Sequence, residues 1–264
     1  MTYPSPLDRA RRAVHDPDPT IRQEAALRLG TLADASMAAE LVSLLVSEDD
    51  FFVRETLTWA VVAQAEAALP HLLAALDRPD ASRVQVLHAL SKIRDQDAVP
   101  HILPLADDPD PAVAAKAWWA LGRTGTPQVV PTLVDRLGDE DEARRRELTA
   151  ALEQLGAPAV PALAERLLDR STLPEVRRHA AEALAAIGDP GARGALDALV
   201  TAVEEDDKEV SVVAVSALGL LDLAEVDGVL ERLRESQDRW LAITADWLLT
   251  DRAERRAERR PRQR

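Results

Sequence analysis

The sequence repeats itself with a period of about thirty residues, and this feature constrains the fold more than any other. Three segments show the pattern most clearly: DPTIRQEAALRLGTL (18–32), DPAVAAKAWWALGRTG (110–125) and PEVRRHAAEALAAIG (174–188). A fixed period of this length is typical of proteins built from stacked structural repeats. The aliphatic residue of the Ile-Arg or Val-Arg pair, as in Ile21-Arg22, is taken as position zero. Eight units then align, 29 to 34 residues apart, with zero positions at Ile21, Val53, Ser82, Val113, Arg144, Val176, Val210 and Leu241.

Each unit contains an amphipathic helix. Positions four and eight after zero are apolar in every unit, as in Ala25 and Leu29 or Ala180 and Leu184. Offsets zero, four and eight lie on one helical face, so each helix is expected to bury that stripe. A leucine-rich segment precedes each of these helices and predicts a partner helix.

Prolines and aspartates mark where the helices begin. Prolines fall at the predicted start of four leading helices, where a missing N–H costs no hydrogen bond, at Pro70, Pro100, Pro131 and Pro161. An Asp stands three residues before the zero position in six units, where its carboxylate can cap the following helix: Asp18, Asp50, Asp110, Asp141, Asp207 and Asp238.

The unit is therefore a helix, an acidic turn and a second helix. One such unit cannot bury its apolar face alone, but stacked neighbours can. The sequence predicts an all-α fold, a right-handed α-solenoid of about eight helix-turn-helix repeats, with the second helices lining the concave side. We expect one solenoid domain over residues 1–250, followed by a basic, Arg-rich tail over residues 251–264 that is partly helical or disordered.

The pattern D-P-x-x-V-R-x-x-A-A-x-A-L-G, followed by x-x-V-P-x-L-x-x-L-L-x-D, resembles HEAT repeats of the phycobilisome-lyase-like type along nearly the whole chain. The resemblance specifies the fold but not the function, because such repeats serve scaffolds, inhibitors, lyase subunits, hydroxylases and DNA glycosylases. It also implies that the Arg after the zero position joins the acidic turns of neighbouring repeats, at Arg22, Arg54, Arg83, Arg145 and Arg177.

Several kinds of chemistry lack a sequence signal. The chain has no Cys, which excludes thiol nucleophiles and thiolate metal sites. HEAT-repeat hydroxylases resembling deoxyhypusine hydroxylase hold a di-iron centre with His-Glu pairs, and none of the five histidines here is followed by Glu. Neither a G-x-S-x-G motif nor a phosphate-binding glycine loop is present. We therefore expect no catalytic residue, no metal ligand and no cofactor.

The open side of the second helices carries the best candidate site. Offset six points away from the buried stripe and holds Trp59, His88 and Trp119 in three consecutive units. Bordering positions supply Lys92, Lys116 and Arg123, and the first two are among only three lysines in the chain. An aromatic and cationic patch in an acidic protein indicates a surface for a partner that bears a carboxylate. The alternative is that these bulky residues fill gaps between repeats.

Spacing predicts packing roles for the other large aromatic residues. Trp118 stands 100° around the helix from Trp119 and is expected to wedge against a neighbouring repeat. Phe51 and Phe52 are expected to act as a staple or a plug between repeats. Trp240 and Trp247, seven residues apart, are expected to face the preceding repeat as a C-terminal cap.

Charge separates the body of the chain from its end. The net charge is −14, and the last thirteen residues, RAERRAERRPRQR, hold seven Arg and two Glu, or +5, which leaves −19 for the rest. An acidic body disfavours a groove that follows a phosphate backbone. Because the tail is positively charged, nucleic-acid binding through it is one alternative function.

Our leading functional hypothesis is a non-enzymatic scaffold that binds a protein or peptide on the concave face. The alternatives are a phycobilin-lyase-like enzyme subunit, a DNA-glycosylase-like enzyme with Trp247 and Asp251 in its groove, and nucleic-acid binding through the tail. The N-terminal segment lacks the apolar run of a signal peptide, and no window is long and apolar enough to span a membrane. We expect a cytoplasmic monomer, and scarce Lys beside abundant Arg points to a bacterium with a GC-rich genome.

Overall fold

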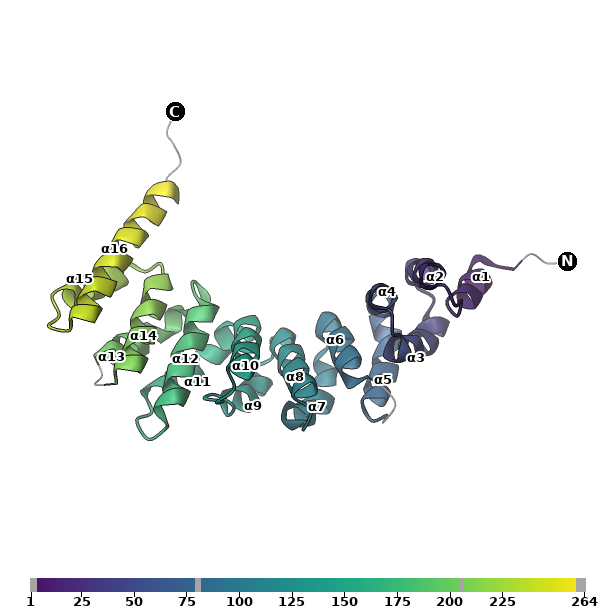
Figure 1. Cartoon of the computed structure of the whole chain (residues 1–264), viewed down its shortest axis with the longest axis horizontal. Helices are drawn as coiled ribbons and strands as arrows, with labels where there is room; N and C mark the ends of the chain where they lie inside the picture. The colour runs from purple at the N-terminus through teal and green to yellow at the C-terminus, as the bar shows by residue number, and fades with distance from the viewer. Residues whose placement is uncertain (1–3, 79–81, 205–206, 260–264) are drawn as a thin grey trace, which may run out of the picture. The chain divides into compact units, whose positions relative to one another are not determined.

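The computed structural model describes residues 4–78, 82–204 and 207–259, and every regular element within these ranges is helical. The helices follow one another in pairs along the chain (Figure 1). They fall into two compact units, Met1–Thr124 and Gly125–Arg264. The predicted all-α solenoid of eight helical pairs is confirmed, with four pairs in each unit.

The first unit contains eight α-helices. Its leading helices are α1 (Pro6–Ala13), α3 (Ala38–Ser47), α5 (Ala65–Leu76) and α7 (Val99–Ile102), the last of which continues as a 3-10 turn (Leu103–Asp107). Its second helices are α2 (Pro19–Leu32), α4 (Phe51–Val62), α6 (Arg83–Ile93) and α8 (Pro111–Thr124). Each second helix packs against the next one, α2 on α4, α4 on α6 and α6 on α8, as expected of stacked repeats.

The second unit repeats this arrangement. Its leading helices are α9 (Val130–Val134), α11 (Val160–Leu168), α13 (Leu196–Val203) and α15 (Ala224–Arg234). Its second helices are α10 (Glu142–Leu155), α12 (Pro174–Ile187), α14 (Lys208–Leu220) and α16 (Arg239–Arg259). They also pack in series, α10 on α12, α12 on α14 and α14 on α16. Short 3-10 turns lead into five of the leading helices: Ala35–Met37, Gln96–Ala98, Pro127–Val129, Ala157–Ala159 and Gly191–Ala195.

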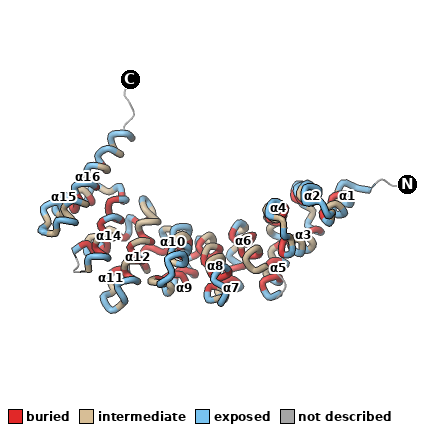
Figure 2. The backbone as a smooth tube through the Cα atoms, viewed as in Figure 1, coloured by how far each residue is buried: buried red, intermediate tan, exposed pale blue. Residues whose placement is uncertain are grey.

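The core follows the predicted stripe. At offset eight, seven of the eight aliphatic residues are buried, and Leu249 in the last repeat is half-buried. Buried residues recur along the helices in Figure 2, separated by intermediate or exposed ones, as expected of amphipathic helices. The small residues Ala25, Ala180, Ala214 and Ala245 at offset four are also buried, which lets successive second helices approach closely.

The predicted capping residues take the expected positions. All six aspartates accept hydrogen bonds from backbone N–H groups of the first turn of the following helix, as Asp50 does from Phe52 and Val53. Pro100, Pro131 and Pro161 lie in the first turn of their helices. The prediction for Pro70 is wrong, because α5 begins five residues earlier, at Ala65, and Pro70 stands in its interior without a donor for the carbonyl of Glu66.

At Arg22 and Arg83 the repeated Arg joins neighbouring turns, as the family resemblance implies, whereas Arg54 and Arg145 donate to carbonyls of their own turn. Arg22 donates to the carbonyls of Asp16 and Pro17 in its own turn and forms a two-pronged pair with Glu48 in the next one, at 2.9 and 2.8 Å. Arg83 likewise reaches the carbonyl of Leu76 and the carboxylate of Asp108. In the repeat where Ser211 replaces the Arg, its hydroxyl donates to the carbonyl of Val203 at 2.8 Å.

Candidate binding surfaces

The six predicted site residues all lie on three consecutive second helices of the first unit. Trp59 is on α4, and His88 and Lys92 are on α6; the remaining three, Lys116, Trp119 and Arg123, are on α8. We call these six residues the aromatic-cationic surface. Since α6 packs against both α4 and α8, the repeat brings side chains from separate sequence segments onto neighbouring helices (Figure 1).

His88 lies at the centre of a charged cluster. Its Nε2 is 3.4 Å from Oε1 of Glu55 on α4, a separation suited to an ion pair, and the atom is shielded from solvent without a hydrogen bond among the described residues. Burial lowers the pKa of His88, Glu55 opposes this, and the positive charges of Lys92 and Lys116 lower the pKa further. The imidazole is therefore largely neutral at pH 7.

Lys92 and Lys116 provide the free positive charge of this surface. Both lie close enough to His88 to act on its pKa, yet within the described part of the chain no carboxylate stands within ion-pair distance of either ammonium group. Lys92 is exposed and Lys116 is half-buried. Two unpaired ammonium groups in a protein of net charge −14 form a local positive field suited to an incoming carboxylate.

Trp119 and Arg123 form a stacked pair one turn apart on α8. The Arg123 guanidinium carbon is 5.6 Å from the centre of the Trp119 ring, within the range of a cation–π contact. The Nε of Arg123 also donates to the carbonyl of Ser91 on α6 at 2.8 Å. Trp119 is half-buried, so part of its ring is held in place and part remains open to a ligand.

Trp59 leans on the preceding repeat. A Cβ added to Gly30 on α2 would lie 2.3 Å from Cζ3 of Trp59, which means that the indole ring covers this glycine directly. The side chain nevertheless remains 46% exposed. One side of the Trp59 ring therefore packs between repeats, and the other faces solvent.

Two residues of this cluster are absent from the sequence-based prediction. Glu55 stands at offset two, which points away from the buried stripe, so helical geometry alone gives the signal that identifies it. Arg94 lowers the pKa of Arg123, after the larger effect of burial. It follows the end of α6 in a left-handed backbone conformation, which the sequence does not reveal.

The aromatic pair at the start of α4 differs from the prediction. Phe51 and Phe52 are 58% and 67% exposed, so they do not plug the space between repeats. Their rings contact each other edge to face, with centroids 5.5 Å apart, and the guanidinium of Arg54 lies over Phe51. The predicted plug is wrong because both residues are the first two of α4 and precede its buried stripe, which begins at Val53.

Trp118 is buried, as predicted. Its Nε1 donates to the carbonyl of Ala106 at 3.0 Å. Ala106 belongs to the 3-10 turn that leads into the same repeat, so this hydrogen bond joins the two halves of one repeat rather than two neighbours.

The prediction for the last helix is wrong. Trp240 and Trp247 are 46% and 61% exposed and do not face the preceding repeat. Ala245 and Leu248 occupy that role, and Leu248 lies directly against Gly219 of α14. The two Trp residues stand on the opposite side of α16 because they lie about 200° around the helix from Ala245.

The start of the predicted basic tail is part of the fold. Helix α16 runs without a break to Arg259, so the predicted division between residues 250 and 251 falls within one helix; residues 260–264 lie outside the described residues. Arg252 is only 5% exposed and donates to the carbonyls of Gly219, Leu221 and Leu223 and to Asp227. Its guanidinium therefore anchors the end of α16 to the loop after α14.

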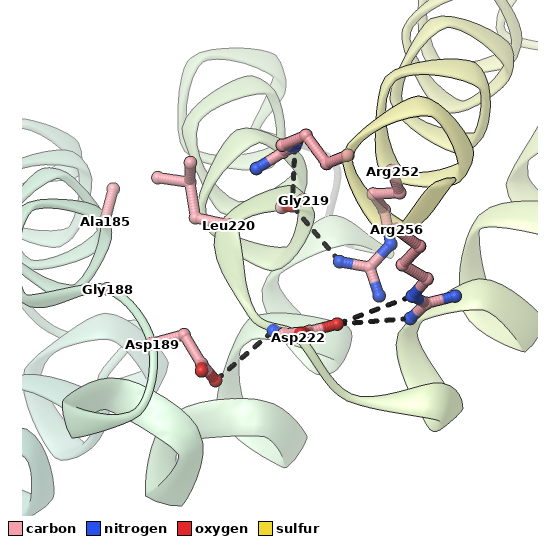
Figure 3. Close-up of a pocket in the computed structure, with 9 residues that line it drawn as sticks. Ala185, Gly188, Asp189, Gly219, Leu220, Asp222, Arg252 and Arg256 are labelled. Carbon is pink, nitrogen blue, oxygen red and sulfur yellow. Dashed lines mark hydrogen bonds and ion pairs between the residues drawn. The ribbon is translucent and has the colours of Figure 1, made fainter. Parts of the chain in front are cut away.

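A cavity of about 240 Å³ lies beside this anchor, between the ends of α12 and α14 and the second half of α16 (Figure 3). Arginines and aspartates line it, and the cations are already paired, Arg256 with Asp222 and Asp227 and Arg255 with Asp251. Burial raises the pKa of Asp227, but the hydrogen bonds from Arg256 and Arg252 outweigh this and hold it below its ordinary value. The cavity is thus a byproduct of the ion-pair network that fixes α16.

None of the described helices combines the length and the apolar character needed to span a lipid bilayer.

Taken together, the stacked helical pairs and the open surfaces on their second helices define an α-solenoid repeat protein. A sequence profile described as HEAT repeats matches residues 1–62, 69–153, 131–219 and 160–250. These segments span most of the chain, and the protein belongs to the HEAT-repeat family.

Known proteins similar to this chain differ in what they do. A deoxyhypusine hydroxylase from Neurospora crassa is 30% identical over 222 residues, 80% of this chain and 67% of the relative. The karyopherin Kap121p, solved with the extreme C-terminus of the protein phosphatase Cdc14p, matches in fold with a TM-score of 0.57 and 16% identity, over 94% of this chain and 33% of the karyopherin. The CpcE–CpcF complex of phycocyanin lyase from Nostoc sp. PCC7120 matches with a TM-score of 0.44 and 20% identity, over 95% and 96% of the two chains.

The residues present do not fit the di-iron centre that a hydroxylase relative implies. Within the described ranges, no three His, Asp or Glu side chains come together in a group able to hold a metal ion. His15 contacts Glu40, His88 faces Glu55, and His179 forms hydrogen bonds with Gly138 and Thr149. These three imidazoles therefore belong to separate repeats and do not come together.

Proposed function

We propose that the protein is a non-enzymatic scaffold whose aromatic-cationic surface binds a protein or peptide segment that presents a carboxylate. The observation that carries the proposal is the pair of unpaired ammonium groups of Lys92 and Lys116 near His88, on helices α6 and α8, with the partly exposed rings of Trp59 on α4 and Trp119 on α8. Aromatic and cationic side chains with little freedom to move are typical anchors of protein interfaces.

The anchors are partly preorganised. Trp59 rests on Gly30, and Arg123 is held by Ser91 and by the Trp119 ring, so binding immobilises few side chains. Preorganisation of this kind improves affinity because less conformational entropy is lost on association. A related fold, that of Kap121p, is seen with a bound peptide segment, which supports a HEAT solenoid as a peptide receptor.

Hydroxylase activity is not carried over from the Neurospora relative, because neither the sequence nor the described residues supply the ligands for its metal centre. The glycosylase alternative also loses support, since the carboxylate of Asp251 is paired with Arg255. The alternative of nucleic-acid binding through the basic tail loses cations in the same way. Aspartates of the last repeats already pair with three of its arginines, Arg252, Arg255 and Arg256.

Affinity purification from the native cell tests the proposal. We expect the wild-type chain to recover a protein partner that a Lys92→Glu, Lys116→Glu variant and a Trp59→Ala, Trp119→Ala variant do not. A Phe51→Ala, Phe52→Ala variant is the matched control, because it removes two exposed aromatic rings of the same unit that lie outside the aromatic-cationic surface. Equal recovery by all four proteins would contradict the choice of site, and a bound pigment or glycosylase turnover would contradict the scaffold function.

A further inference from the structure

Helix α16 presents an apolar stripe that no described part of the chain covers. Trp240, Ile243 and Trp247 are 46%, 59% and 61% exposed. Spacings of three and four residues place them on one side of the helix, opposite Ala245 and Leu248, which pack toward α14. Large exposed side chains gathered in this way mark interaction sites far more often than isolated ones do.

The surface around this stripe is hollowed, and the charges that line it, Arg239 and Asp246, are of opposite sign. Ile243 and Trp247 line an open depression together with Arg239, Ala242, Asp246 and Thr250. The neighbouring helix α14 has no charged residue from Val210 to its end at Leu220. The adjacent helix therefore brings no competing charge to an apolar ligand.

The second half of the same side is acidic. Glu254 and Glu258 lie seven and eleven residues after Trp247, so they continue the stripe on the same helical face. Both are exposed, and within the described part of the chain no cation stands within ion-pair distance of either carboxylate. The nearby arginines Arg252, Arg255 and Arg256 are committed to other aspartates.

We propose that this side of α16, the α16 face of Trp240, Ile243, Trp247, Glu254 and Glu258, docks an amphipathic helix of a protein partner. The partner helix places apolar side chains over the two indoles and Lys or Arg side chains opposite Glu254 and Glu258. From Trp240 to Glu258 the face is roughly 27 Å long at 1.5 Å per residue, which matches a partner helix of about five turns. An i, i+3, i+7 set of anchors is the usual geometry of helix recognition.

Charge favours this occupant over two others. An anionic membrane would be repelled by the two glutamates on the same side as the indoles. A second copy of the chain, paired in parallel through its own α16 face, would place the glutamates of the two copies against each other, and an antiparallel copy would offer them only Arg239. A basic amphipathic helix complements both halves of the face. This proposal does not depend on the aromatic-cationic surface, which lies in the other unit.

Two matched helical peptides of about eighteen residues, free of Trp and labelled with fluorescein, test the proposal by fluorescence anisotropy. Both carry Leu at i, i+3 and i+7; one has Lys and the other Glu at the positions opposite Glu254 and Glu258. We expect the Lys peptide to bind the full chain at least tenfold more tightly than the Glu peptide, with a preference that weakens as salt is added.

Three double variants locate the binding. We expect Trp240→Ala, Trp247→Ala to weaken binding of the Lys peptide at least thirtyfold, and Glu254→Lys, Glu258→Lys to reverse the preference between the peptides. The control Phe51→Ala, Phe52→Ala, which removes two exposed rings of the first unit, should bind as the wild type does, and circular dichroism should show all three folded. The Lys92→Glu, Lys116→Glu chain removes the positive charge that could attract the Glu peptide to the aromatic-cationic surface. Equal binding of both peptides by that chain, or no binding of the Lys peptide by the wild type, would overturn the proposal. So would a dimer in light scattering that the Trp240, Trp247 variant abolishes, or binding to phosphatidylserine vesicles instead of peptide.

Discussion

The imidazole of His179 on α12 accepts a hydrogen bond at Nδ1 from the backbone N–H of Gly138, at 3.1 Å. Since Nδ1 accepts, the proton of the neutral ring is on Nε2, which lies 2.9 Å from Oγ1 of Thr149 on α10. His179 has no solvent-exposed surface and so links two successive repeats of the second unit from within. Burial, with a further effect of Arg145, lowers its pKa from 6.5 to about 4.

This histidine predicts a pH-dependent loss of stability. The pKa is lower in the folded state than in the unfolded state, so between about pH 6.5 and pH 4 the unfolded chain binds more protons. The stability from the neutral ring is therefore full above pH 6.5 and declines as the pH falls toward 4. At about 1.4 kcal/mol per pH unit the loss approaches 3 kcal/mol. Urea unfolding of the wild type at pH 7 and pH 4.5 measures it.

His179→Asn is the informative comparison, because an amide oxygen can accept the Gly138 hydrogen bond but cannot titrate in this range. We expect the variant to be less stable than the wild type at pH 7 and to lose less stability at pH 4.5. His101→Asn, at an exposed position, should keep the wild-type pH profile. Identical profiles for His179→Asn and the wild type would contradict this role of His179.

Substitution of Gly30 by Ala is expected to destabilise the protein. A methyl group there would meet Cζ3 of Trp59 at 2.3 Å and the Cα of Ala60 at 2.9 Å, so α4 itself would have to shift. We expect Gly30→Ala to destabilise the protein by about 1–3 kcal/mol, although Ala is the better helix former by about 1 kcal/mol. Thermal unfolding followed by circular dichroism measures the change.

Gly228→Ala is the matched control for Gly30→Ala. It also lies inside a helix, α15, but a Cβ there would meet no atom within 4 Å. This substitution should therefore stabilise the protein by about 0.5–1 kcal/mol through helix propensity alone. If the two glycines respond alike, the contact between Trp59 and α2 is not close.

Arg252 predicts that the end of α16 is needed for the last repeat to fold. Arg252→Ala would leave the carboxylate of Asp227 and the carbonyls of Gly219, Leu221 and Leu223 without their shared donor in a shielded site. Removing one partner of a buried ion pair costs about 3–5 kcal/mol. Hydrogen exchange of α15 and α16 should increase first. Arg239→Ala, at an exposed position, should change stability by less than about 0.5 kcal/mol.

The periodicity of the sequence predicts the fold in detail because each repeat must bury the same stripe. Offsets four and eight, the Asp caps and most of the prolines depend only on local geometry, and the structure confirms them. Offset zero holds only in part, because it is buried at Val53, Val113 and Val210 and exposed at Ile21 and Arg144. Pro70 fails because the sequence shows where a proline is tolerated but not where its helix begins. Phe51 and Trp247 fail for a related reason, since spacing gives the direction of a side chain but not what lies in that direction.

The candidate site could be predicted in part for the same reason. Offset six places Trp59, His88 and Trp119 on neighbouring helices, and an offset rule applied to Glu55 would have completed the cluster. The anchoring of Arg252 could not be foreseen, because three of its acceptors are backbone carbonyls about thirty residues away that leave no side-chain signature, and Asp227 is one of many acidic residues in the sequence.

The adjacent residues Trp118 and Trp119 predict opposite results for the same substitution. Trp118→Phe removes an indole N–H that bonds the carbonyl of Ala106 and leaves unfilled space in a buried site, so we expect a loss of about 1–3 kcal/mol with partner binding retained. Trp119→Phe keeps an aromatic face beneath Arg123, so its effect on stability should stay below about 1 kcal/mol. Partner recovery should instead fall, because a smaller ring offers less contact area. Unfolding curves and affinity recovery, measured on both variants, test whether Trp118 serves packing and Trp119 serves binding. A larger stability loss from Trp119→Phe than from Trp118→Phe would contradict these two roles.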